Sequence, residues 1–221
     1  MPRPKIHPLG DHALVITSPP PATLSCQARI WQLAKLAHTW EHIVDVVPGM
    51  NNLTIIFDPL QADPTTLARQ LDQGWDAAAA GAKSQLASPK IIDIPVRYGG
   101  DAGPDLGALA EHAKMTPRGV AEVHAATVYT VYFLGFQPGF AYLGTLDARL
   151  HMPRRAEPRM RVPAGSVAIG GEQTGVYPSA SPGGWQLIGR TDMPLFDATR
   201  DPASLMQAGD QVRFIIESIT E

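Results

Sequence analysis

Arginines are concentrated in a proline-rich stretch of the sequence, residues 148–165. The stretch reads ARLHMPRRAEPRMRVPAG, and no lysine follows Lys114. The planar guanidinium presents N–H donors that match carboxylate and phosphate groups. Alternating prolines restrict the backbone, so less entropy is lost when an anion binds. We predict an anion site that includes Arg154, Arg159 and Arg161. The alternative is a solvated basic loop.

A glycine-rich stretch follows, GSVAIGGEQTGVYPSASPGGW (residues 165–185). Glycines let backbone amides approach a ligand closely, and Gln173, Thr174, Tyr177 and Ser181 add neutral hydrogen-bonding groups. This set suits a polar, amide-like ligand. The stretch matches neither the P-loop pattern nor the dinucleotide-binding fingerprint. The alternative is a series of tight turns between strands.

His124 is the best candidate for general acid or base chemistry in the second half of the chain, because a histidine titrates near neutral pH. The alternative is a structural histidine. Residues 38–42, HTWEH, match a zinc-peptidase pattern, but no third ligand stands at an informative spacing, so we predict no metal site. Cys26 lies in an apolar helical pattern and is predicted to be a core residue.

Residues 134–146, LGFQPGFAYLGTL, combine glycines and a proline with large aromatic side chains. We interpret the stretch as a rigid strand and turn with an aromatic wall. Phe140 is expected in the core, with Tyr142 or Gln137 directed toward a ligand or a partner subunit. The order of the rings along the chain does not decide which one faces the ligand.

Two regions with different patterns of predicted helices and strands must position these residues. Residues 11–17, 42–49 and 51–59 have strand patterns, and residues 21–40 and 63–80 have helical patterns. The order β-α-β-β-α predicts an α+β first domain. Residues 90–98 either close it as a final strand, giving a split βαβ sandwich, or cross into the next domain.

A small, polar segment at residues 80–90 is predicted to be a linker. Two short helices are expected within residues 104–126, followed by short strands between glycines and prolines, which predicts a closed or nearly closed β-barrel. The predicted domains are therefore residues 1–90 and residues 91–221.

The composition excludes several classes of protein. The chain has 221 residues, a net charge of −3 and a single cysteine, Cys26, so no internal disulfide can form. Nothing in the overall charge suggests a nucleic-acid or membrane partner. The first residues lack the apolar run of a signal peptide, and no segment reaches the roughly 20 apolar residues of a membrane span. We expect a cytoplasmic protein.

Long motifs make the sequence resemble a known family. The sequence is similar to the family of the 5-oxoprolinase B subunit, also called KipI or allophanate hydrolase subunit 1. The matching segments are YTVYFLGFQPGFAYLG, MPRRAEPRMRVPAGSVAIGGEQTGVYPSASPGGWQLIGRT, GDQVRF, GDHALVI and IPVRYGG…PDL, the last at residues 94–106. The resemblance covers nearly the whole chain. In one departure, Asn52 stands where the family usually has serine.

The resemblance implies a small split-βαβ-like first domain and a cyclophilin-like β-barrel second domain. It also implies an enzyme component that is inactive alone and acts with the C and A subunits of 5-oxoprolinase. That complex would hydrolyse 5-oxoproline, a small-molecule substrate, to glutamate with ATP and magnesium. Alternatives within the resemblance are a KipI-like inhibitor of a sensor histidine kinase and a component of a urea- or allophanate-type amidohydrolase or carboxyltransferase. A prolyl isomerase, suggested by the barrel alone, ranks last.

Residue type and motif position give hypotheses for the site. His124 would move a proton, and Arg161, with Arg154 and Arg159, would hold anions. Gln173 and Thr174 would hydrogen-bond the lactam. The remaining predicted binding residues lie in the same motifs: Gln137, Tyr142, Ser166, Tyr177 and Arg190.

Overall fold

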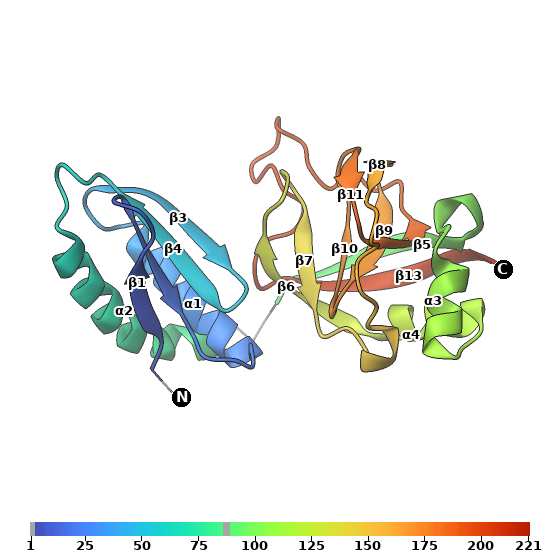
Figure 1. Ribbon diagram of the computed structural model, residues 1–221, viewed down its shortest axis with the longest axis horizontal. Coiled ribbons are helices and arrows are strands. Elements are labelled where there is room, and N and C mark those ends of the chain that lie inside the picture. The colour runs from blue at the N-terminus through green and yellow to red at the C-terminus, as the bar shows by residue number, and fades with distance from the viewer. Residues whose placement is uncertain (1–2, 86–88) are drawn as a thin grey trace. The chain divides into compact units, whose positions relative to one another are not determined.

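The chain divides into two compact units, residues 1–89 and residues 90–221 (Figure 1). The structure is a computed structural model that describes residues 3–85 and 89–221, with the side chains of residues 83–85 outside the description. The observed boundary lies one residue from the one expected from sequence texture. In the described ranges, no helix is long and apolar enough to cross a membrane.

The first unit is a four-stranded antiparallel sheet with two helices packed against it. Its strands run in the order β1-β2-β4-β3. The elements are β1 (Lys5–Pro8), β2 (Ala13–Thr17), α1 (Leu24–Ala37), β3 (Ile43–Gly49), β4 (Asn52–Phe57) and α2 (Pro64–Gln85).

Local sequence signals set the start of both helices. Thr23 caps α1, because its hydroxyl oxygen accepts a hydrogen bond from the Cys26 N–H at 3.2 Å. Asp63 precedes α2 and accepts from the Thr66 N–H at 2.8 Å. The apolar faces of the helices and of β2 and β4 then form one core that includes Leu33, Leu53, Ile55, Leu71 and Trp75.

The second unit is a closed barrel of seven strands in the order β10-β7-β6-β13-β5-β12-β9. These strands are β5 (Ile91–Gly99), β6 (Val128–Leu134), β7 (Ala141–Gly144), β9 (Ser166–Gly170), β10 (Gln173–Val176), β12 (Gln186–Arg190) and β13 (Gln211–Thr220). A separate two-stranded sheet pairs β8 (Arg159–Val162) with β11 (Ser181–Gly183). The barrel interior is filled by side chains such as Ile94, Val131, Ile169 and Phe214.

Helices α3 (Leu106–Ala113) and α4 (Pro117–Ala126) lie side by side against the barrel (Figure 1). Short 3₁₀ helices occupy Gly100–Ala102 and Ala148–Leu150. Thr116 caps α4 by accepting from the Gly119 N–H at 3.0 Å, and Pro117 occupies the first turn, where its missing N–H costs no hydrogen bond.

The predicted fold class, an α+β unit followed by a β-barrel, is confirmed. The open question about residues 90–98 is answered: they form β5, which pairs in parallel with β13 inside the barrel. The linker prediction for residues 80–90 was wrong over residues 80–85, which continue α2, and residues 86–88 lie outside the described part. The strand β1 was missed.

Gly99 joins β5 to the turn before α3 in a conformation that only glycine adopts easily. Its φ is +74° and its ψ is −170°, and a Cβ built there would lie 1.9 Å from the Thr220 carbonyl oxygen of β13. The chain at Gly99 therefore approaches the end of β13 too closely for any side chain.

We expect Gly99→Ala to lower the free energy of unfolding by about 2–4 kcal/mol, from backbone strain and the clash with β13. Gly107→Ala is the matched control, because Gly107 lies in α3 with open space around its Cα. The control should be neutral or stabilising by up to about 1 kcal/mol. Urea denaturation measures both, and equal effects would contradict this account.

Candidate functional site

A small cavity of about 90 Å³ in the second unit brings an arginine together with aromatic rings. We call it the arginine–aromatic pocket, and its lining residues are Phe136, Phe140, Tyr142, Arg154, Tyr177, Gly183, Gly184 and Trp185. Phe140 is buried at the centre of the wall, with edge-to-face contacts to Tyr142, Tyr177 and Trp185 at centroid distances of 4.9, 5.2 and 5.5 Å. Such packing makes a rigid wall.

Arg154 and Phe136 are the exposed members of the pocket. The Arg154 guanidinium carbon lies 5.9 Å from the Trp185 ring centroid, within range of a cation–π contact. Phe136 is 60% exposed and has a positive φ of 68°, which is uncommon for a bulky residue. Both side chains are therefore placed to touch a bound molecule or a neighbouring protein.

Asp105, the residue before α3, holds the arginine-rich loop to the barrel. Its carboxylate accepts from Arg159 Nη2 at 2.7 Å, from Arg155 Nη1 at 3.4 Å and from the Leu187 N–H of β12 at 2.7 Å. The Asp105 N–H in turn donates to the Leu187 carbonyl at 2.9 Å. A buried carboxylate needs such partners, so this set fixes the loop beside the pocket.

The second guanidinium nitrogen of Arg159 is a candidate hydrogen-bond donor to a bound anion. Arg159 Nη1 is buried and has no hydrogen-bond partner within residues 3–85 and 89–221. An unmet buried donor costs free energy, and an anion bound there would satisfy it. Burial raises the pKa of the nearby Tyr177 and of Tyr142, so both phenols remain neutral hydrogen-bonding groups at pH 7.

His124 lies in the barrel core, not in the arginine–aromatic pocket. Its side chain is fully buried; its Nδ1 lies 2.8 Å from the Tyr98 hydroxyl and its Nε2 2.9 Å from Thr174 Oγ1. Thr174 donates to the Ala168 carbonyl at 3.0 Å, so its oxygen accepts the Nε2 proton and the Tyr98 hydroxyl donates to Nδ1. Burial lowers the pKa of His124 to about 3. This geometry favours a structural role, and proton transfer by His124 stays a prediction.

The other predicted site residues lie at different places. Arg161 is exposed and has no ion-pair partner in the described part of the chain. The Gln137 amide exchanges hydrogen bonds with Ser179 at 2.8 and 3.3 Å, in the loop next to Phe136. Ser166 is buried opposite Arg190 in the β9–β12 ladder. Gln173 and Arg190 each keep one buried nitrogen without a partner among the described residues.

The structure therefore brings together Tyr142, Arg154 and Tyr177. The other predicted site residues do not line this pocket: His124, Gln137, Arg159, Arg161, Ser166, Gln173, Thr174 and Arg190. Sequence reasoning missed Asp105 as a site residue. Asp105 had two signals, its place in the PDL segment of the family resemblance and a carboxylate ahead of a helix, and the second is ordinary for a helix start.

The described residues contain no group of three or more His, Cys, Asp or Glu side chains that could hold a metal ion. In particular, α1 ends at Ala37, so the HTWEH motif at residues 38–42 is not on a helix as the zinc pattern requires.

Sequence comparison places the chain in a family. Residues 4–206 match the family described as carboxyltransferase domain, subdomain C and D. The chain is 47% identical over 217 residues to the 5-oxoprolinase B subunit of Escherichia coli O157:H7, covering 97% of each chain. The chain belongs to the 5-oxoprolinase B subunit family. The corresponding protein of Haemophilus influenzae is also 47% identical, over 214 residues, covering 97% of this chain and 98% of that one. The resemblance read from the motifs is thus confirmed.

More distant relatives embed the same two units in longer proteins. The crystal structure of TTHA0988 superposes with a TM-score of 0.78 and 32% identity, over 92% of this chain and 39% of that chain. Urea amidolyase of Saccharomyces cerevisiae is 32% identical over 205 residues, 78% of this chain but only 11% of its own length. The two-unit arrangement therefore recurs as one part of larger chains.

We expect Asp105→Asn to lower the free energy of unfolding by about 2–3 kcal/mol, because two guanidinium groups lose a buried counter-charge. Arg155 is 37% exposed, so most of the loss should come from Arg159. Asp93→Asn is the control: Asp93 binds Arg213 at 2.7 and 2.8 Å, but both side chains are 48% exposed. The control should cost less than about 1 kcal/mol in urea denaturation.

The depressed pKa of His124 predicts a pH-dependent stability. In the unfolded chain His124 binds a proton near pH 6.5, whereas in the folded chain it does so only near pH 3. The contribution of neutral His124 to the free energy of unfolding is therefore fully present above pH 6.5 and is lost as the pH falls toward 3. Between pH 7 and pH 5 the loss should be about 2 kcal/mol. Urea denaturation at several pH values measures this dependence. The free energy of unfolding should lose its slope against pH in His124→Gln and keep it in the control, His7→Gln, because His7 is exposed. An unchanged slope in His124→Gln would contradict the assignment.

Proposed function

We propose that this chain is the B subunit of an ATP-dependent 5-oxoprolinase, which opens the 5-oxoproline lactam to give L-glutamate. The observation that carries the proposal is the likeness to two proteins of that name, at 47% identity over nearly the full length of each. The chain would be inactive alone and act in a hetero-oligomer with the C and A subunits, because a B subunit works as one part of an assembly.

The chemistry of the substrate explains which groups the site needs. A lactam resists water because its amide is resonance-stabilised, and phosphoryl transfer from ATP to the amide oxygen would activate the carbonyl carbon for attack by water. Negative charge accumulates on the phosphoryl group and on the substrate carboxylate. Fixed cations and neutral hydrogen-bond donors in a water-poor site stabilise such charge.

The arginine–aromatic pocket supports this proposal through its shape and charge. A cavity of about 90 Å³ suits a small ring, so the lactam ring would lie against Phe140 and Trp185. Arg154 and Arg159 Nη1 would bind the carboxylate or the transferred phosphoryl group. The neutral hydroxyl of Tyr142 or Tyr177 would hydrogen-bond the lactam.

The residues present fit the phosphates of ATP better than its metal. Arg154 and Arg161 are exposed cations without ion-pair partners in the described part of the chain, which suits phosphate binding. A magnesium ion would accompany the nucleotide, because Mg²⁺ is usually bound through substrate phosphates and keeps several of its waters.

A second candidate is a carboxyltransferase-type reaction on urea or a related amide. It is favoured by the matched family description and by the similarity to urea amidolyase. The same arginines would then bind a carboxylated substrate, so the two functions differ in substrate and not in the residues that hold it. Substrate choice must be measured on the assembled protein.

The decisive experiment is glutamate release from 5-oxoproline and ATP by this chain alone, with the C subunit, and with both the C and A subunits. We expect activity only in the full set. No activity from a folded, associated set would overturn the proposal. ATP turnover dependent on urea or allophanate would then support the second candidate, and binding of a histidine kinase would support a regulator.

Within the active set, we expect Arg154→Ala to lower kcat/KM for 5-oxoproline about tenfold to a hundredfold, because a bound anion loses its cation. Arg154→Lys should recover part of the loss. Arg118→Ala is the control, since Arg118 binds only the exposed Glu221, at 3.1 Å. Equal kcat/KM for Arg154→Ala and the control would remove Arg154 from the site.

A further inference from the structure

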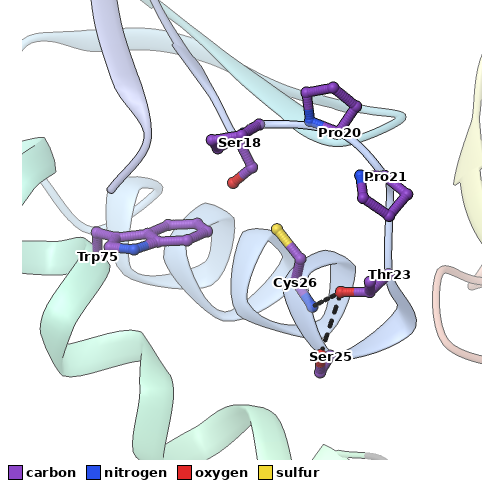
Figure 2. A pocket seen from close by; sticks show the side chains of 8 residues that line it. Ser18, Pro20, Pro21, Thr23, Ser25, Cys26 and Trp75 are labelled. Carbon is purple, nitrogen blue, oxygen red and sulfur yellow. Dashed lines mark hydrogen bonds between the residues drawn. The ribbon is translucent and has the colours of Figure 1, made fainter. Parts of the chain in front are cut away.

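A second cavity lies in the first unit and has no part in the proposed reaction. Its volume is about 260 Å³, and its lining residues are Ser18, Pro19, Pro20, Pro21, Thr23, Ser25, Cys26 and Trp75 (Figure 2). Trp75 borders one side, the Pro20 and Pro21 rings border the other, and Ser18 and Cys26 lie between them. We call it the Ser18 pocket.

Ser18 gives this pocket an unmet hydrogen-bonding group. The residue is 5% exposed, and its Oγ is buried without a partner in the described part of the chain. Figure 2 shows the hydroxyl directed into the space between Trp75 and Cys26. A buried hydroxyl without a partner is unfavourable, and a ligand that reaches it would remove that cost.

The neighbouring polar groups are already engaged. The Cys26 thiol donates to Asn51 Oδ1 at 3.3 Å, and the Thr23 hydroxyl oxygen caps α1 by accepting from the Cys26 N–H at 3.2 Å. The Ser25 hydroxyl lies 3.2 Å from that of Thr23 at the exposed rim. Ser18 is therefore the lining side chain best placed to bind a ligand.

The walls of the pocket are fixed before any ligand arrives. The Asn51 side-chain amide binds the carbonyls of Ser18 and Pro19, and the Ser18 N–H donates to the Asn51 carbonyl at 3.0 Å. The prolines restrict φ. The Trp75 ring is covered by the Arg29 guanidinium, 4.4 Å from the ring centroid. Little conformational entropy would be lost on binding.

The lining determines the chemical class of the ligand. It contains no charged side chain, so an ion would lose its hydration without gaining a counter-charge. The proline rings and the indole present flat apolar faces that favour an aromatic ring. The volume is just below the roughly 300–1,000 Å³ of drug-sized sites, so the ligand must be small.

We propose that the Ser18 pocket is a binding site for a small, neutral aromatic molecule that carries one hydroxyl group, which hydrogen-bonds to Ser18 Oγ. The site lies in the first unit, so it goes beyond the proposed function and does not depend on it. Cys26 contributes a wall of the pocket and is not itself a ligand-binding group.

The test compares three probes of similar size on the full chain: phenol, toluene and benzoate. Cys26 is the single cysteine and lines the pocket, so its rate of alkylation by iodoacetamide reports occupancy. We expect phenol to slow alkylation in a saturable way, toluene to do so more weakly, and benzoate to require at least a tenfold higher concentration. Amide chemical shifts in NMR spectra should change around Ser18 and Trp75.

Two variants separate the hydrogen bond from simple apolar filling. Ser18→Ala should weaken phenol binding about fivefold and leave toluene binding unchanged, because only the hydroxyl contact is lost. The matched control, Ser25→Ala, removes a hydroxyl from the exposed rim and should change neither. Circular dichroism verifies that both variants are folded.

Equal phenol affinity in Ser18→Ala and the parent chain would overturn the proposal, as would equal protection of Cys26 by benzoate and phenol. Shifts confined to other parts of the chain would overturn it too. These outcomes are independent of glutamate release, so failure of this site and failure of the proposed function can be told apart.

Discussion

The arrangement of the candidate site depends on one buried carboxylate. Asp105 is desolvated at the start of α3, and it is stable there because Arg159, Arg155 and the Leu187 N–H surround it. These partners come from the arginine-rich loop and from β12, which are far apart in the sequence. Satisfying one acid therefore fixes the loop against the barrel. The Arg155 N–H adds a 2.7 Å hydrogen bond to the Gly184 carbonyl, which places the neighbouring Arg154 at the pocket.

Charge in the second unit is distributed unevenly. Arg97, Arg149 and Arg213 are each held by a carboxylate, whereas Arg154 and Arg161 have no such partner in the described ranges. Two exposed cations without an ion-pair partner among the described residues therefore lie close together in the sequence of the arginine-rich loop. Fixed positive charge of this kind raises the local concentration of small anions. The tyrosines nearby remain neutral, so they do not cancel this charge.

Sequence patterns predicted the elements whose signals are local. The helices α1 and α2 and the strands β3 and β4 were predicted from local patterns, while β1 was missed because four residues bounded by prolines carry little periodicity. Of the residues chosen for their arginine, aromatic and polar side chains, Tyr142, Arg154 and Tyr177 line one cavity. Asp105 was missed because its importance depends on Leu187, 82 residues away. His124 was chosen because its residue type suits proton transfer. The residue type does not reveal whether the side chain is buried, and burial determines the pKa of His124.

The parallel pairing of β5 with β13 has a consequence for how the chain acquires its structure. The first unit makes its contacts within residues 1–89, so it can fold as soon as that part has been synthesised. The barrel pairs its first strand with its last, from Gln211–Ile91 to Thr220–Gly99. Its closure must wait until β13 has been synthesised, and the loop closed at that moment spans more than a hundred residues. Until then the edges of β5 and β6 remain open, and the growing protein must be kept from pairing them with another chain.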